Sequence, residues 1–269
     1  MDRPQTQTLI DADEHKSNIW EEIYHIRTYE VDCHNRLLIS SMFNFMQDTA
    51  SKHADALGVS VQNLLSENHT WLLSRLKIKI STHPGINDRI KVCTWPSGAQ
   101  RLFALRDFEL RNGNGQSIAA AVSAWLVVDV HRRRPVRIMP FVKRLKPLEG
   151  RHIIAEPLEK LPGFDPDDTH EKNFVARYGD LDVNQHVNNV SFVEWAVEGV
   201  PSSLLKTSVL VQLEINFLAE AFYEDCILAL CRPDGLDKTV YYHSLVRQQD
   251  GRELARARSV WQPPRMPSA

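Results

Sequence analysis

The chain has 269 residues, a hydrophobic content of 43%, a charged content of 25% and a formal net charge of −2. These values are typical of one large or two modest globular domains. The charge balance argues against a general nucleic-acid-binding protein, which usually carries a strong basic excess. No apolar run reaches the ~18 residues of a membrane span, and the first residues lack the apolar core of a signal peptide. We therefore expect no membrane span and a cytoplasmic location. The four cysteines form no Cys-x-x-Cys pair, so we expect no disulfide frame and no metal site, and no motif predicts a cofactor.

The first half of the chain predicts one helix followed by four strands. Residues 39–57 carry apolar side chains at helical spacing, and residues 58–70 are expected to form a loop. Strand-like segments follow at 72–80, 89–95, 102–110 and 119–130. The pair Asn112-Gly113 between the last two segments indicates a hairpin turn.

A proline-rich and charged stretch, residues 130–174, separates the two halves. Its prolines are Pro135, Pro140, Pro147, Pro157, Pro162 and Pro166. This composition predicts a linker that runs over the protein surface. We place a first domain at 15–140, the linker at 141–172 and a second domain at 173–263.

The second half repeats the order of the first. A helix-like segment at 190–205 precedes strand-like segments at 209–217, 225–231, 239–246 and 254–261. Asp88 then corresponds to Asp225, and Trp125 to Trp261. The repeat predicts a duplicated α+β fold, in which each half packs a long helix on a curved antiparallel sheet. The alternative is one irregular α+β domain. Joining the two sheets edge to edge would remove two exposed edges, and the chain would be a monomer that mimics a dimer, or a homodimer.

The polar loop before the second predicted helix is the densest group of catalytic side-chain types in the chain. Asp182, Asn184 and His186 stand at every second position, directly before the apolar segment. Such a loop can hold a water molecule or a carbonyl group against groups that transfer protons. The alternative is that Asp182 or Asn188 only caps the helix.

The sequence Asp180-Leu-Asp-Val-Asn-Gln-His-Val-Asn-Asn189, followed by Trp195, Glu198 and Pro201, closely resembles the signature of the acyl-acyl-carrier-protein thioesterases. That family includes plant and bacterial enzymes built from two tandem hotdog domains, so the resemblance implies this fold. The resemblance runs from about Trp20 to Trp261. In the first half it includes Trp71, Trp95, Arg106, Asp107 and Trp125.

The resemblance also implies an activity, which is hydrolysis of a fatty acyl thioester on acyl carrier protein. The catalytic residues that it implies are Asp182, Asn184, His186 and Glu220. Ala221 stands where plant members have cysteine, which excludes a cysteine nucleophile at this position and favours water activation by the carboxylate and the imidazole. The plant transit peptide and hydrophobic anchor are missing, as expected of a bacterial cytoplasmic enzyme.

Two mechanisms stay open for these residues. Asp182 or Glu220 could deprotonate a water molecule or attack the thioester directly, while His186 shares a proton with one of them. Asn184 would orient the water or the carbonyl. A backbone N–H at the start of the helix beginning near Val190 would stabilise the oxyanion. The chain has no Gly-x-Ser-x-Gly motif, so a serine hydrolase mechanism has no support.

The first half carries a degenerate copy of this loop, with Asp32, His34 and Asn35 at a different spacing. We interpret this copy as a vestigial site and expect the first half to hold the acyl chain. Ordinary core packing is the alternative for each of the candidate lining residues, which are Met42, Phe45, Met46, Trp71 and Leu73.

A basic cluster near the start of the linker includes Arg132, Arg133 and Arg134. Acyl carrier proteins are acidic, so this cluster could steer their docking; a solvated linker surface is the alternative. The resemblance and the residues of the loop leave three functions open. The first is hydrolysis of acyl-acyl carrier protein to free fatty acid. The alternatives are hydrolysis of acyl-CoA on the same site and non-catalytic acyl binding.

Overall fold

The computed structural model describes residues 18–163, 169–235 and 237–264. The first residues of the predicted first domain, 15–17, and residues 164–168 of the predicted linker lie outside these ranges. The elements of the first half are β1 (Trp20–His25), the 3-10 helix η1 (Thr28–Glu30), α2 (Ile39–Ala56), α3 (Val61–Ser66), β2 (His69–Ile80), β3 (Arg89–Gln100), β4 (Phe103–Asn112) and β5 (Ser117–Asp129). No helix in the described part of the chain is long and apolar enough to cross a membrane.

The second half follows two short linker elements, β6 (Arg134–Pro135) and α4 (Met139–Leu145). Its own elements are β7 (His170–Val175), the 3-10 helix η2 (Tyr178–Asp180), α5 (Asn189–Glu198), α6 (Ser202–Thr207), β8 (Val209–Phe217), β9 (Cys226–Asp234), β10 (Asp237–Arg247) and β11 (Arg252–Gln262). The repeated order confirms the predicted α+β duplication.

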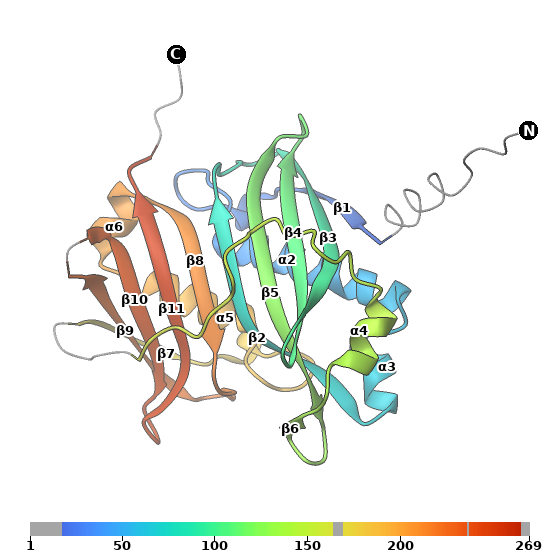
Figure 1. The fold of residues 1–269 in the computed structure, drawn as a ribbon. Helices are drawn as coiled ribbons and strands as arrows, with labels where there is room; N and C mark the ends of the chain where they lie inside the picture. The colour runs from blue at the N-terminus through green and yellow to red at the C-terminus, as the bar shows by residue number, and fades with distance from the viewer. Residues whose placement is uncertain (1–17, 164–168, 236, 265–269) are drawn as a thin grey trace, which may run out of the picture.

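All strands belong to one 11-stranded sheet, whose order is β1-β3-β4-β5-β2-β8-β11-β10-β9-β7, with β6 paired to β5 (Figure 1). From the central pair outward, the order is β2-β5-β4-β3-β1 in the first half and β8-β11-β10-β9-β7 in the second, so equivalent strands occupy equivalent places. The two halves join where β2 and β8 pair antiparallel, with Leu76 opposite Ile215. The predicted edge-to-edge joining is therefore confirmed, and it removes one edge from each half.

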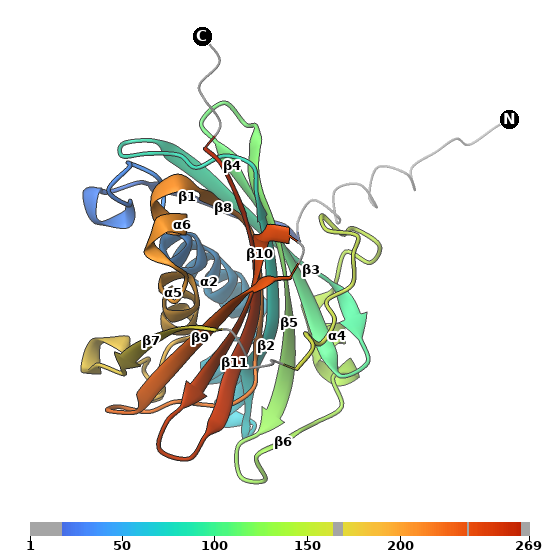
Figure 2. The same ribbon diagram turned by 90° about the vertical axis from the view of Figure 1, so that its left-hand side faces the viewer.

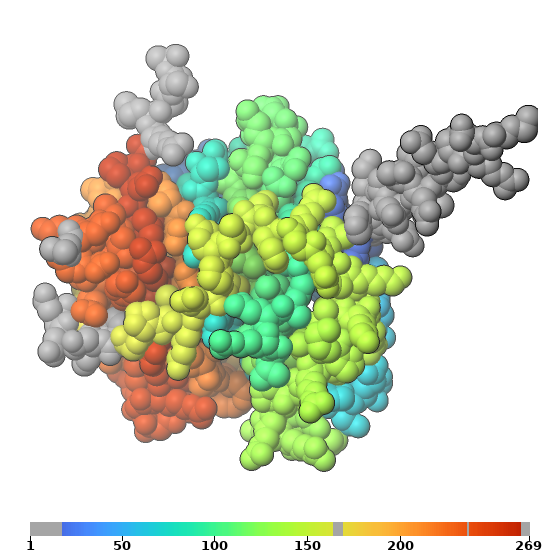
Figure 3. Space-filling view, in the orientation of Figure 1, coloured from blue at the N-terminus to red at the C-terminus, as the bar shows by residue number. Residues whose placement is uncertain are grey.

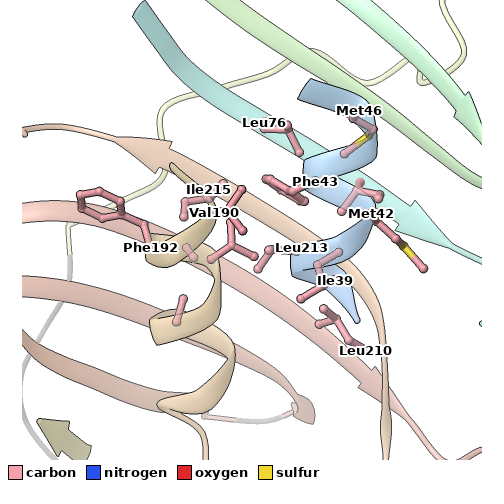
Figure 4. Close-up of a cluster of buried hydrophobic side chains, with 14 of the residues drawn as sticks. Ile39, Met42, Phe43, Met46, Leu76, Val190, Phe192, Leu210, Leu213 and Ile215 are labelled. Atoms are coloured by element: carbon pink, nitrogen blue, oxygen red, sulfur yellow. The ribbon is translucent and has the colours of Figure 1, made fainter. Parts of the chain in front are cut away.

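Helices α2 and α5 lie on the same face of the sheet, which curves around them (Figure 2). Apolar side chains recur along α2 at helical spacing, so one side of the helix can be buried. Met42, Phe43 and Met46 of α2 meet Val190 of α5 and residues of β2 and β8, including Leu213, in the main hydrophobic core (Figure 4). This shared core places the start of α5 beside the helix of the first half.

Two local predictions were wrong. The segment 190–205 forms two helices, because α5 ends at Gly199 and Pro201 precedes α6. A Cβ at Gly199 would lie 3.0 Å from the Trp195 carbonyl oxygen, a tight contact that favours glycine at this turn. Residues 58–70, expected as a loop, contain α3, which Ser60 caps by accepting a hydrogen bond from the Asn63 N–H.

The linker was predicted to run over the surface, and in the described residues it also buries most of its apolar side chains. After α4 it crosses the face of the sheet opposite the helices (Figures 1 and 3). Ile154 and Leu158 are buried against Val122 and Ala124 of β5. The outer face of the sheet is apolar there, and covering it removes that surface from water. The domain boundaries placed on either side of this linker stay a prediction.

Candidate active site

A tight loop between η2 and α5 carries three of the predicted site residues. Leu181 and Val187 form a β-bridge at its base, and the Asp182 N–H donates to the His186 carbonyl oxygen at 2.7 Å. Gln185 closes the turn with φ 64°, in the left-handed region. The loop therefore has a defined conformation immediately before α5.

The Asp182 carboxylate is occupied by its own loop. Its Oδ1 accepts from the Asn184 N–H at 2.8 Å and from the His186 N–H at 3.3 Å. Its Oδ2 lies 3.4 Å from the Asn184 Nδ2 donor. In this arrangement Asp182 orients Asn184 and His186, as aspartates in Asx turns orient the backbone that follows them.

Glu220 reaches the same site from the segment between β8 and β9. The Val187 N–H donates to the Ala221 carbonyl oxygen at 2.9 Å, which ties that segment to the loop. Glu220 Oε1 then lies 3.6 Å from His186 Nδ1, with side-chain exposures of 42% and 32%. Phe222 packs edge-on against the imidazole at 5.3 Å. The structure thus pairs a carboxylate and an imidazole that water can reach.

The corresponding loop of the first half has the same backbone but different side chains. Asp32 Oδ1 accepts from the N–H groups of His34 and Arg36, as Asp182 does from Asn184 and His186. Asp32, His34 and Asn35 differ in spacing from Asp182, Asn184 and His186 as stated, but the residue four positions after Asp32 is the structural counterpart of His186. Arg36, which the sequence comparison missed, occupies the place of His186, and its Nη2 pairs with Asp32 Oδ2 at 2.7 Å.

The place of Glu220 in the first half is taken by His83. Leu37 N–H donates to the Pro84 carbonyl oxygen as Val187 N–H does to that of Ala221, so His83 corresponds to Glu220. Its Nε2 lies 2.9 Å from the Leu210 carbonyl oxygen, and burial lowers its pKa. The first half therefore holds a guanidinium and an imidazole at the positions of His186 and Glu220, and its interpretation as a vestigial site stays a prediction.

The first turn of α5 leaves one backbone donor without a recorded acceptor among the described residues. Asn188 Oδ1 accepts from the Val190 N–H at 3.0 Å, and the Asn188 carbonyl oxygen accepts from the Ser191 N–H. The N–H of Asn189 remains. The oxyanion donor at this helix end stays a prediction, and of these N–H groups only that of Asn189 has no acceptor among the described residues.

The five predicted lining residues fall into two groups. Four of them are buried in the main core: Met42, Phe45 and Met46 on α2, and Leu73 on β2. Trp71 packs instead against a second cluster near α4, including Phe141, and its indole N–H donates to the Val59 carbonyl oxygen. Their role in acyl binding stays a prediction.

The remaining predicted residues are exposed: Arg132 and Arg133 lie in the turn between β5 and β6, and Arg134 is the first residue of β6. A buried arginine was not assigned any role from sequence. Arg106 donates through Nη1 to His53 Nδ1 at 3.1 Å and to Thr94 Oγ1 at 3.2 Å. Burial lowers the pKa of His53 to about 3, so its neutral ring accepts this bond. In the described part of the chain, no three His, Cys, Asp or Glu side chains gather as metal ligands would.

Both halves of the chain match models of known protein families. The family model for the acyl-ACP thioesterase N-terminal domain matches residues 17–144, and the model for the C-terminal domain matches residues 164–263. A chloroplastic acyl-[acyl-carrier-protein] hydrolase of Cuphea viscosissima is 26% identical over 259 residues, which cover 91% of this chain and 63% of the relative. A chloroplastic palmitoyl-acyl carrier protein thioesterase of Arabidopsis thaliana is 27% identical, covering 90% and 64%. The chain thus spans less than two thirds of the length of these relatives.

Solved structures show the same architecture. An acyl-ACP thioesterase from Bacteroides thetaiotaomicron has a TM-score of 0.81 at 24% identity and covers 92% of this chain and 99% of its own. The 12:0-ACP thioesterase from Umbellularia californica has a TM-score of 0.82 at 22% identity, covering 91% and 98%. These likenesses confirm the predicted fold of two tandem hotdog domains. The chain belongs to the acyl-ACP thioesterase family.

Proposed function

We propose that this chain hydrolyses fatty acyl thioesters carried on acyl carrier protein and releases free fatty acid. The observation that carries the proposal is the approach of Glu220 to His186, at 3.6 Å, in the half that bears the family motif. The same positions of the first half hold His83 and Arg36, which cannot form a carboxylate–imidazole pair. The relatives named as acyl carrier protein hydrolases support the substrate class.

The geometry favours Glu220 over Asp182 as the base, because the Asp182 carboxylate already accepts loop hydrogen bonds. Glu220, paired with His186, takes a proton from a water molecule, whose oxygen attacks the thioester carbonyl carbon. The Asn189 N–H and the Asn184 carboxamide stabilise the oxyanion and orient the water. When the C–S bond breaks, the proton held by Glu220 passes through the His186 imidazole to the thiolate, and both groups return to their starting state.

Direct attack by Glu220 is the competing mechanism, since a carboxylate can form an anhydride with the acyl group. A single turnover in ¹⁸O-labelled water gives a one-way test of direct attack. Water attack on the thioester, or hydrolysis of an anhydride at its acyl carbon, puts the label only in the fatty acid. Label found in the Glu220 peptide by mass spectrometry would show that the carboxylate attacked.

The activity is tested by thiol release from acyl carrier protein loaded with fatty acyl chains of several lengths. We expect Glu220→Gln and His186→Gln each to lower kcat by about 10²–10⁴-fold, the usual contribution of a general base. Glu198→Gln is the matched control, because Glu198 is an exposed glutamate of α5 that pairs with Lys172. Wild-type protein that releases no thiol from any of these substrates contradicts the proposal.

Docking of the carrier through the basic hairpin is part of the same proposal. Arg132, Arg133 and Arg134 are exposed, and charge attraction would raise the association rate of an acidic carrier. Reversing the three charges should raise KM for the carrier-bound substrate and leave KM for a small thioester unchanged. Unchanged KM for both substrates would contradict docking through this hairpin. A cytoplasmic location and the oligomeric state stay predictions from the sequence.

A further inference from the structure

The long helix of the first half contacts the catalytic loop of the second half through Gln47. Gln47 lies on α2 and is partly buried, and its Nε2 donates to Asn188 Oδ1 at 3.3 Å. The Val190 N–H also donates to Asn188 Oδ1, at 3.0 Å. Because that atom accepts from a backbone N–H, it is the oxygen of Asn188, and the Gln47 carboxamide must present its donor side.

Asn188 connects the catalytic loop to the helix that follows. Its backbone N–H donates to the Asp180 carbonyl oxygen, and its side chain caps α5. His186 lies two residues before it, and directly after it comes the N–H of Asn189, which has no acceptor among the described residues. A rotation of Asn188 would therefore move the oxyanion donor relative to the imidazole, and a hydrogen bond from a second helix restricts that rotation.

The internal repeat shows that packing between the halves does not require this bond. Leu38 corresponds to Asn188, because its N–H donates to the Glu30 carbonyl oxygen as that of Asn188 donates to Asp180. The same offset makes Val197 of α5 the counterpart of Gln47. Neither Leu38 nor Val197 has a side chain that can hydrogen-bond. The polar pair therefore occurs only beside the loop that carries His186 and Glu220.

We propose that Gln47 is a positioning residue for thioester hydrolysis, supplied by the first half to the active site of the second. It holds the Asn188 carboxamide so that the first turn of α5 presents the Asn189 N–H to the thioester carbonyl oxygen. The inference rests on the proposed function and adds to it. It means that the first half contributes to the chemical step as well as to substrate binding.

The test compares Gln47→Ala and Gln47→Glu with Ser51→Ala, a change at an exposed position of the same helix. Glutamate keeps the shape of glutamine but cannot donate to Asn188 Oδ1. Loss of one neutral hydrogen bond should lower kcat about five- to tenfold in both Gln47 variants, with KM within about twofold of wild type. Ser51→Ala should keep the wild-type kcat. Thermal melts give the folded fraction used to normalise each kcat.

A second background separates positioning from general stability. Asn188→Ser still caps α5 but does not reach Gln47, so adding Gln47→Ala to it should change kcat by less than about twofold. Equal losses in both backgrounds would overturn the proposal, as would a wild-type kcat for Gln47→Ala with only a lower melting temperature.

A readout that needs no turnover keeps the two proposals distinguishable. Gln47→Ala should speed amide hydrogen exchange at Val190 and Ser191, in the first turn of α5, and Ser51→Ala should not. Unchanged exchange at both amides overturns the positioning role even if the enzyme is active. A wild-type protein with no activity on any thioester overturns the proposed function, whatever the exchange rates show.

Discussion

Removing the Glu214 carboxylate tests how the two halves are held together at the centre of the sheet. Lys77 of β2 lies opposite Glu214 of β8, with Nζ 3.4 Å from Oε2 and side-chain exposures of 11% and 9%. At an effective dielectric constant of ~20, two unit charges at that distance attract by about 5 kcal/mol. Burying each ion costs several kcal/mol, so the pair is close to neutral overall while a lone charge is strongly unfavourable.

Glu214→Gln keeps the side-chain shape and leaves the Lys77 charge without its partner. We expect the free energy of unfolding to fall by about 3–5 kcal/mol at pH 7. The double variant Lys77→Met/Glu214→Leu removes both charges and should stay within about 1 kcal/mol of wild type. Urea unfolding followed by tryptophan fluorescence measures both values.

The matched control is Glu156→Gln. This change removes an exposed carboxylate that pairs with Lys79, which lies on β2 as Lys77 does. This change should leave the urea midpoint where it is in wild type, because exposed ion pairs contribute little. The reasoning is refuted if Glu214→Gln behaves like Glu156→Gln, or if the double variant is as unstable as Glu214→Gln alone.

Three further outcomes are expected. Burial lowers the pKa of His243 to about 4, so the unfolded chain takes up this proton first, near pH 6.5. The contribution of neutral His243 to the free energy of unfolding is fully present above pH 6.5 and is lost as pH falls, by about 2 kcal/mol at pH 5. The free energy of unfolding of His243→Gln, measured in urea, should therefore depend less on pH than that of wild type. The same pH dependence in both proteins would contradict this assignment. Burial raises the pKa of the Cys93 and Cys231 thiols to about 12, so iodoacetamide at pH 7 should leave both unmodified while it labels the exposed Cys33. Thiol release should then stay at the wild-type rate, and a loss that follows labelling would argue for a cysteine in the mechanism. Finally, Leu158→Ala should cost about 2–5 kcal/mol in the free energy of unfolding, because Leu158 is a buried side chain of the linker; a loss below about 1 kcal/mol would mean that the linker does not stabilise the sheet.

The duplicated fold could be predicted because its signals are local. Alternating apolar residues in segments such as 209–217 produce a strand with one buried face, and helical spacing in 39–57 produces a helix with one buried side. The order of these segments repeats along the chain, so the architecture follows without distant contacts. The short strands β1 and β7 were missed because each alternates over only six residues and pairs with a distant strand, β3 or β9.

In the candidate site too, some features follow from the local sequence and others only from the tertiary fold. The spacing of Asp182, Asn184 and His186 is a local property, and the Asp182 turn that orients them forms within the loop itself. Glu220 was placed in the site from the family resemblance, and the distance between its carboxylate and His186 depends on how β8 and β9 bring their connecting segment against the loop.

By itself, the sequence determined the two repeated halves and the polar loop before α5, because neighbouring residues encode periodicity and turns. Tertiary structure alone showed that Arg36 and His83 stand in the first half where His186 and Glu220 stand in the second, since their equivalence is visible in matching hydrogen bonds. The contact of Gln47 with Asn188 likewise exists only because the joined sheet packs two helices against each other, across a sequence separation of 141 residues.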